Sequence, residues 1–414
     1  MMRKNILKLL KQLVKAEAGI VMAGVLILSV FMFFRFEWGG QQFTYLAKAY
    51  LSGKPYFLEK PGSWWDTVRV DNKYYWPLGQ LPAVMLTLPV KIYRTGFWQG
   101  YLQLAMLFLT AGLGFVIARK GGFPKWHSAV LAFGFCFASV YHMAAGIPTS
   151  WYISHGLAVV FILAALGESL TAKRFWVIGI LMAAVLWIRF TAGLGVVYFL
   201  FMAWEGGAGR LQKLKRVGQL VMPLVLSVVM FLIYNRIIFG SMFSNGYRDV
   251  NATFLNVRER FELVNYGLFK IKNIPTNFYY YFIKMPDPIT LKVISYWGRT
   301  FILKPPYVTT DYPGVSFFVV SPVFLYMLRA NLKKKQVIWA IVTSIAVLAT
   351  ILMWYWPGWV QTGPRYMMDL LPFLYVILLE SFPGKKLPIF TQGLIIASAV
   401  FNYYLLITIL PALM

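Results

Sequence analysis

The sequence predicts an all-α, polytopic membrane protein with about 11 transmembrane helices, in the range 11–12. Hydrophobic residues make up 59% of the 414 residues and charged residues only 13%, about half the charged share of an ordinary soluble domain. Apolar runs of spanning or near-spanning length recur along the chain, and short basic segments separate them. A soluble protein with many buried helices is not expected, because too little polar sequence remains to cover such a core.

The predicted spans follow the apolar runs in order. These runs lie at 20–36, 101–118, 128–146, 156–167, 175–188, 191–204, 217–234, 313–328, 337–356, 366–380 and 387–412. The piece 78–90 is only 13 residues long and contains two prolines, so we predict a short or re-entrant helix there. Residues 1–414 then form one transmembrane domain, with an outer loop at 37–78 and a second large outer segment at 240–312.

The placement of the net charge of +26 orients the chain and does not indicate nucleic-acid binding. Lys and Arg gather in the N-terminal segment and in the short loops near 119–125, 173–174, 210–216, 329–335 and 385–386. Short basic loops mark the cytoplasmic side of a membrane and meet anionic lipid headgroups. We therefore predict a multi-pass protein of the cell membrane with a cytoplasmic N-terminus, an uncleaved first span and no nucleic-acid partner.

The acidic residues indicate where chemistry is expected. Most of the 14 lie in the two outer segments, and Asp369 alone falls inside a predicted span. Glu37 comes directly after the first apolar run, close to Arg35. Carboxylate chemistry is therefore expected on the outer, extracytoplasmic face.

The first outer loop begins with an amphipathic stretch. Its apolar residues are Phe43, Leu46, Ala47, Tyr50 and Leu51, and its polar residues are Gln41, Gln42, Thr44, Lys48 and Ser52. This spacing predicts an interfacial helix that lies on the outer leaflet and forms the wall of a pocket beside Glu37.

The stretch "WWDTVRVDNKYYWPLGQLP" follows in the same loop. Trp and Tyr at such points are typical of the membrane–water interface. Here they are mixed with Asp66, Asp71, Arg69 and Lys73. Such a mixture of carboxylates, cations and rings suits the binding of a sugar phosphate.

Seven fragments, taken in their order and spacing, resemble a known superfamily. They are "QQFTYLAKAYLSGKPYF", "VDNKYYWPLGQLPAVMLTLPV", "WYISHGLAVVFILAALGES", "LWIRFTAG", "YNRIIFGSMFSNGY", "GLFKIKNIPTNFYYYFIKMPDP" and "GPRYMMDLLPFL". The chain resembles the GT-C superfamily of polytopic membrane glycosyltransferases over most of its length, and prokaryotic members most of all. Such enzymes use lipid-linked sugar donors and carry a catalytic acid in the first outer loop. Two departures are Glu37, where the acid is often Asp, and "PLGQLP", where a proline pair is expected.

The resemblance implies transfer of a hexosyl or pentosyl group from a polyprenyl-phosphate sugar donor to a glycan, lipid or protein acceptor. That reaction needs a general base for the acceptor hydroxyl and positive charge at the departing phosphate. Glu37 is the predicted base because a partly desolvated carboxylate has a raised proton affinity. Neutralisation of Glu37 by Arg35 is the structural alternative, and Asp66 and Asp71 are the alternative acids. No cofactor is certain, although a divalent metal (Mg²⁺ or Mn²⁺) would also serve at the phosphate.

Six further residues are predicted to bind the donor phosphate or the substrate: Arg69, Lys73, His155, Arg189, Arg365 and Tyr366. Arg189 interrupts an apolar stretch, where an arginine is costly unless it faces water or an anion. The alternative is a structural arginine in a helix hairpin whose side chain snorkels to the membrane surface. His155 lies at the predicted outer start of a helix. The alternative to ligand binding is a structural role in which its ring is hydrogen-bonded. Arg365 and Asp369 are four residues apart, which predicts a mutually neutralising pair on one helix face.

Two other classes of protein remain open. A lipid or lipid-linked-sugar transporter or flippase is compatible with the fold, although the repeated broken helices of transporters are not visible. A non-catalytic envelope assembly protein with the same fold is compatible with the Glu-for-Asp departure. The glycosyltransferase interpretation requires Glu37 to share a water-accessible hollow with Arg189, Arg365 and His155.

Overall fold

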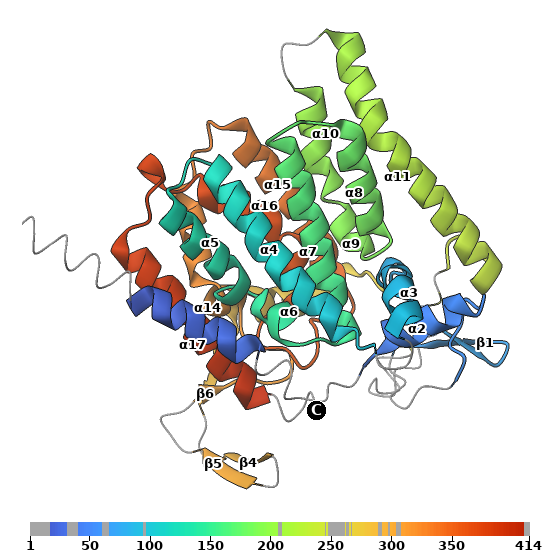
Figure 1. Cartoon of the computed structure of the whole chain (residues 1–414), viewed down its shortest axis with the longest axis horizontal. Coiled ribbons are helices and arrows are strands. Elements are labelled where there is room, and N and C mark those ends of the chain that lie inside the picture. The colour runs from blue at the N-terminus through green and yellow to red at the C-terminus, as the bar shows by residue number, and fades with distance from the viewer. Residues whose placement is uncertain are drawn as a thin grey trace, which may run out of the picture.

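The computed structural model (Figure 1) describes residues 17–30, 40–59, 66–93, 97–205, 209–244, 246, 261, 265, 267–288, 292–296, 299–303 and 308–409. Within these residues, five helices are long and apolar enough to cross a membrane: α4 (Gly100–Lys120), α7 (Ser150–Ser169), α11 (Arg210–Phe239), α15 (Lys335–Met353) and α17 (Ile389–Ile409). Shorter apolar helices are Glu17–Val30, α3 (Leu81–Tyr93), α8 (Phe175–Leu186) and the pair α9 (Phe190–Gly193) and α10 (Val196–Trp204). The polytopic helical fold is confirmed, and the count of about 11 spans stays a prediction.

The remaining helical elements are shorter than a membrane span. The α-helices are α2 (Gln42–Leu51), α5 (Lys125–Phe137), α6 (His142–Gly146), α13 (Ile274–Phe278), α14 (Phe317–Val320) and α16 (Leu371–Leu379). The 3₁₀ helices are η3 (Ile271–Asn273), η5 (Pro322–Arg329), η6 (Arg365–Asp369) and η7 (Pro383–Lys385), and η4 (Tyr279–Ile283) is a π-helix. The piece 78–90 thus contains the short helix α3, as predicted.

Helix α7 forms the centre of the core. Its sequence "SWYISHGLAVVFILAALGES" is apolar on nearly every side, which is typical of a helix buried all round. Helices α4, α8 and α16 and the 3₁₀ helix η6 pack against it. Helix α11, in contrast, runs along the outside of the bundle beside α8 (Figure 1) and exposes apolar side chains such as Met222 and Ile237. Those side chains are suited to contact lipid.

Three predicted apolar runs are divided in the structure. The run 128–146 splits into α5 and α6 at Ser139, whose hydroxyl donates to the Phe135 carbonyl at 2.5 Å and accepts from the Tyr141 amide at 3.1 Å. A serine that binds nearby backbone in this way competes with helical hydrogen bonds. The run 313–328 splits into α14 and η5 at Pro322, which has no amide hydrogen to continue a helix. The run 366–380 is η6 followed by α16.

Helix α2 forms where an interfacial helix was predicted, but its buried face differs from the prediction. Leu51 is 45% exposed, while Gln42 and Thr44 are buried. The reason is that α2 packs on α3 and on the start of α7, where the Ser150 hydroxyl donates to Gln42 Oε1 at 2.7 Å. Gln42 therefore faces protein, because a hydrogen-bond partner is present there.

Among the described residues, the two segments predicted to lie outside contain three two-stranded antiparallel sheets, which the all-α prediction missed. Strands β1 (Val68–Val70) and β2 (Lys73–Tyr75) pair in the first outer loop. In the second segment, β3 (Asp287–Pro288) pairs with β6 (Val308–Thr309), and β4 (Lys292–Tyr296) pairs with β5 (Arg299–Leu303). The first hairpin turns at Asp71 and Asn72, both with positive φ, as a two-residue type I′ turn requires.

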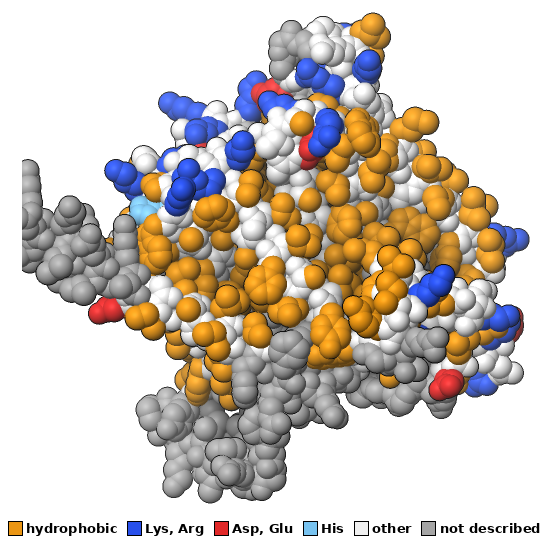
Figure 2. Space-filling model, in the orientation of Figure 1, with side chains coloured by type: hydrophobic (Ala, Val, Ile, Leu, Met, Phe, Trp, Pro, Cys, Tyr) orange, Lys and Arg blue, Asp and Glu red, His pale blue; other side chains and the backbone are white. Residues whose placement is uncertain are grey.

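The two ends of the helix bundle differ in character. Basic side chains gather at the upper end in Figure 2, above a broad hydrophobic surface. This is the end where α10 meets α11 (Figure 1). The N-terminal half of α7, the start of α9 and η6 lie together at another place, as hydrogen bonds between them show. The predicted topology, with basic loops inside and these segments outside, needs such a separation. The orientation in the membrane stays a prediction.

A glycine holds α3 against the segment that carries Arg189. A Cβ atom at Gly79 would lie 2.2 Å from the Ile188 carbonyl oxygen and 2.3 Å from that of Trp187. We expect Gly79→Ala to lower the unfolding free energy by about 1–3 kcal/mol, since backbone must move to make room. Thermal unfolding in detergent checks this. Gly112→Ala is the matched control, because nothing lies within 4 Å of that position. Equal midpoints for both variants would contradict the expectation.

Candidate functional site

Three segments that are distant in sequence meet at the N-terminal half of α7. His155 lies on α7 and Asp369 ends η6. Arg189 directly precedes α9, in the break between α8 and α9, and Thr191 lies in α9. Arg189 has extended backbone angles, with φ −150° and ψ 114°, so the chain turns there. The turn directs the arginine side chain to Asp369, as their hydrogen bonds show.

Asp369 is the centre of this network and is fully buried. Its Oδ1 accepts from Arg189 Nε at 2.8 Å and lies 3.1 Å from His155 Nδ1. Its Oδ2 accepts from an Arg189 Nη atom at 3.1 Å and from the Thr191 hydroxyl at 2.5 Å. A bidentate guanidinium–carboxylate pair of this kind is strong and fixes orientation. Arg189, only 14% exposed, is therefore held by Asp369. We call these four residues the Asp369 network.

The predicted pairing of Arg365 with Asp369 is wrong. In the described part of the chain, the carboxylate is paired with Arg189 and His155, and no ion pair joins it to Arg365. The prediction assumed an α-helix, whereas residues 365–369 form a 3₁₀ helix. With three residues per turn, positions four apart no longer share a face.

Arg365 instead lies among rings and a backbone carbonyl. Its guanidinium donates to the Trp359 carbonyl at 2.9 Å and lies 5.2 Å from the centroid of the Tyr366 ring and 5.7 Å from that of Tyr152. Its Nε is buried without a hydrogen-bond partner among the described residues. No described carboxylate is within ion-pair distance of it. Arg365 therefore supplies a positive charge that is open to an anion.

Asp66, one of the alternative acids, is buried beside this cation. The indole of Trp151 donates to its Oδ2 at 2.6 Å. Burial raises the pKa of the Asp66 carboxyl, while the Trp151 hydrogen bond and the charge of Arg365 act in the opposite direction. Desolvation of this kind is common among catalytic acids and bases.

An aromatic hollow of about 520 Å³ opens next to Arg365. Its walls include Tyr280, Tyr312, Tyr355, Trp356 and Trp359, with the polar side chains of Asp311 and Asn273 between them. Trp359, whose carbonyl accepts from Arg365, joins the hollow to the cation. The Asp311 Oδ1 atom is buried and has no hydrogen-bond partner in the described part.

The structure sorts the predicted site residues into two groups. His155, Arg189, Arg365 and Tyr366 lie together, with the His155 and Tyr366 ring centroids 5.6 Å apart. Arg69, Lys73 and Asp71, in contrast, are exposed on the β1–β2 hairpin. Arg69 donates to Asn72, and Lys73 lies over the Tyr56 ring. Nothing described on the hairpin links these three to the Asp369 network. Glu37 and Arg35 lie outside the described residues.

Sequence reasoning missed the roles of Thr191 and Tyr281. Tyr281 is fully buried, and its hydroxyl has no hydrogen-bond partner among the described residues. It interacts electrostatically with Tyr366 and Arg365. Its only signal in the sequence is the aromatic run "NFYYYFI", a pattern equally typical of a membrane surface.

The need for a metal ion stays a prediction. Among the described residues, no group of three or more His, Cys, Asp or Glu side chains is placed to hold one. Glu37, the predicted catalytic acid, is not among those residues, so the acids of the first outer loop are only partly described.

The fold and the site define a helical membrane protein in which one arginine without a described carboxylate partner, Arg365, lies beside a ring-lined hollow. No family model matches the chain, and no curated protein matches it. It is similar to the solved structure of ArnT from Cupriavidus metallidurans bound to undecaprenyl phosphate, with a TM-score of 0.47 and 13% identity, over 96% of this chain and 71% of that one. It is also similar to the apo oligosaccharyltransferase of Archaeoglobus fulgidus, with a TM-score of 0.40 and 13% identity, over 94% of this chain and 55% of that one. At these scores the likeness carries no conclusion about substrate or residues.

Proposed function

We propose that the protein is a membrane glycosyltransferase that uses a polyprenyl-phosphate-linked donor and acts on the extracytoplasmic face. It transfers a hexosyl or pentosyl group to a glycan, lipid or protein acceptor. The observation that carries the proposal is the environment of Arg365, a guanidinium without a described carboxylate partner between an aromatic hollow and a buried acid. A guanidinium suits phosphate, and ring-lined pockets with a few polar atoms suit small ligands.

The reaction follows from these side chains. A carboxylate takes the proton of the acceptor hydroxyl, and the freed oxygen attacks the anomeric carbon of the donor sugar. The bond between that carbon and the phosphate oxygen breaks, and the electron pair leaves with the polyprenyl phosphate. Arg365 stabilises the negative charge that grows on the phosphate, which is the effect of a preorganised cation in a partly dry site. The aromatic hollow holds a sugar ring.

Glu37 is our first candidate for the base, as the family resemblance implies, and Asp66 is the second. The first outer loop enters the described region at Gly40, three residues after Glu37 in the sequence. A Cβ atom at Gly40 would lie 3.3 Å from the Trp151 ring, and Trp151 donates to Asp66. Gly40, three residues after Glu37 in the sequence, and Asp66 therefore lie beside the same tryptophan.

The pH dependence of transfer separates the two acids. If Asp66 is the base, transfer rises with pH through its pKa, which burial places above the ordinary value for Asp. Protonation at lower pH then removes the base, and Asp66→Asn abolishes this acid limb. If Glu37 is the base, Glu37→Gln abolishes the limb and Asp66→Asn leaves it in place. A profile of kcat/KM against pH for the three proteins decides, because it reports groups of the free enzyme.

A donor panel tests the proposed function itself. The full chain, purified in detergent, is mixed with radiolabelled polyprenyl-phosphate sugars and with acceptors from each of the three classes. We expect transfer from at least one donor by the wild type, and loss of transfer in either Glu37→Gln or Asp66→Asn. If the wild type transfers none while it moves labelled lipid across vesicle bilayers, the protein is a flippase and the proposal fails.

A further inference from the structure

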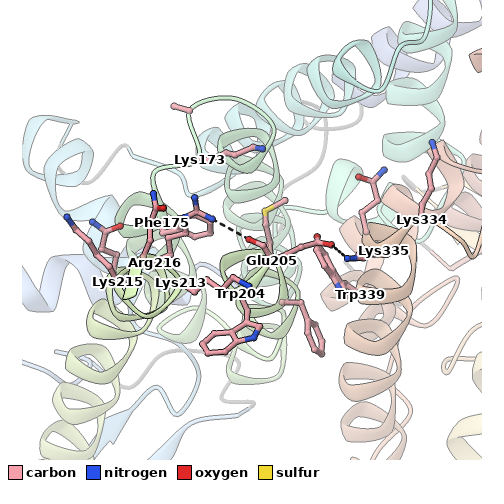
Figure 3. A pocket seen from close by; sticks show the side chains of 16 residues that line it. Lys173, Phe175, Trp204, Glu205, Lys213, Lys215, Arg216, Lys334, Lys335 and Trp339 are labelled. Atoms are coloured by element: carbon pink, nitrogen blue, oxygen red, sulfur yellow. Dashed lines mark hydrogen bonds and ion pairs between the residues drawn. The ribbon is translucent and has the colours of Figure 1, made fainter. Parts of the chain in front are cut away.

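A second cavity, which we call the basic hollow, lies at the other end of the bundle. It has a volume of about 1520 Å³ and opens between the ends of α8, α10, α11 and α15. Figure 3 shows its lining, with basic side chains on α11 and at the start of α15 on either side of Glu205. None of the site residues described above takes part in it. The basic hollow is therefore independent of the proposed reaction.

The basic hollow carries an excess of positive charge. Its basic residues are Lys173, Lys213, Lys215, Arg216, Lys334 and Lys335, and its single acid among the described lining is Glu205. The acid pairs with Lys335 at 2.8 Å, and Lys334 pairs with Glu380 at 2.6 Å.

The other four cations make no ion pair with any described residue. Arg216 donates to the Glu205 carbonyl at 3.3 Å and lies over the Phe175 ring, so its side chain is already oriented toward the hollow. A group of lysines around one oriented arginine attracts an anion. The ammonium groups of the lysines and the planar guanidinium of the arginine both suit phosphate oxygens.

The inner wall of the hollow is aromatic. Phe201 and Trp339 stack with centroids 6.3 Å apart and an interplanar angle of 12°, and Trp204 beside them is 50% exposed. Tryptophan takes such positions at the boundary between headgroups and hydrocarbon. Farther along α11, the exposed side chains are apolar, including Met222 and Leu226. The basic hollow thus combines cations at the end of the bundle with an apolar surface on α11 that continues toward the middle of the predicted span.

We propose that the basic hollow binds one anionic phospholipid of the surrounding bilayer. Its phosphodiester contacts Lys213, Lys215 and Arg216, and an acyl chain lies along Trp204 and the apolar face of α11. A soluble phosphate compound would use the cations but leave the aromatic wall without a partner, which is why we assign the lipid. Basic pockets between membrane helices bind anionic headgroups in this way.

Lipid retention by the purified full chain tests the proposal. The protein is reconstituted in vesicles of equal parts phosphatidylglycerol and phosphatidylcholine and extracted with mild detergent, and its bound lipids are counted by native mass spectrometry. We expect retained phosphatidylglycerol in excess over phosphatidylcholine. Lys213→Gln/Lys215→Gln should lower the retained phosphatidylglycerol about tenfold, because two headgroup contacts are lost.

Lys120→Gln/Lys125→Gln is the matched control, since it removes the same charge from exposed lysines outside the hollow. Equal loss in both double variants, or equal retention of the two lipids by the wild type, would overturn the proposal. Release of the lipid by millimolar inorganic phosphate would also overturn it, because the hollow would then recognise a free anion.

Discussion

Replacing Arg365 by glutamine is expected to lower transfer by about 10²–10³-fold, the usual effect of removing one donor that stabilises transition-state charge. Arg365 has no described carboxylate partner, and one of its buried N–H groups has no acceptor among the described residues. Its charge is therefore not neutralised by a described ion pair. The loss should appear in kcat more than in KM, because the phosphate charge that it meets grows during bond breaking. Initial rates with a labelled donor, at saturating and limiting concentration, measure both quantities.

Arg69→Gln is the matched control for Arg365→Gln. Sequence reasoning placed both arginines at the donor phosphate, but the structure leaves Arg69 exposed on a hairpin with its described contact to Asn72. We expect its transfer rate to stay near that of the wild type. If both variants lose activity equally, the structural sorting of the predicted cations is wrong. If neither does, Arg365 does not bind the phosphate, and the central observation behind the proposed function is removed.

The helical fold was predictable because each membrane-crossing element has a local signal. An apolar run of sufficient length predicts a membrane span without any information about its neighbours. This is illustrated by α4, α7 and α17, which match their predicted runs. The breaks at Ser139 and Pro322 also have local causes, namely a hydroxyl that binds nearby backbone and a missing amide hydrogen. They were missed because hydropathy counts apolar residues and ignores hydrogen bonds.

The site was predictable only in part, because its contacts are not local. The sequence indicated that Arg189 needs an anion and that Asp369 needs a cation, yet it paired Asp369 with a neighbour four residues away. In the structure, Asp369 pairs with Arg189, which is 180 positions away in the sequence. No spacing rule connects such residues, since their meeting depends on how α7, α8 and η6 pack. Tyr281 escaped notice for the same reason, because its complete burial has no signature in its own segment.

Asp369→Leu is expected to lower the unfolding free energy by about 3–5 kcal/mol, the cost of leaving one buried charge without its partner. Asp369 is fully buried, and its loss would leave Arg189, which is only 14% exposed, without its carboxylate partner. Arg189→Met/Asp369→Leu should recover most of this loss, because removing both charges also removes their desolvation. Unfolding in detergent, analysed as a double-mutant cycle, gives the coupling between the two residues.

Glu205→Gln is the control for an exposed ion pair, since Lys335 and Glu205 are 71% and 33% exposed. We expect that variant to cost at most about 1 kcal/mol. A double variant no more stable than Asp369→Leu alone would contradict the pairing seen here. Retained stability of Asp369→Leu would mean that the Asp369 network does not hold the fold. A stable double variant would also test function, because it keeps Arg365 and Asp66. Any transfer activity that it loses then reflects the missing Arg189 side chain or the positions of His155 and Tyr366, which Asp369 and Arg189 contact.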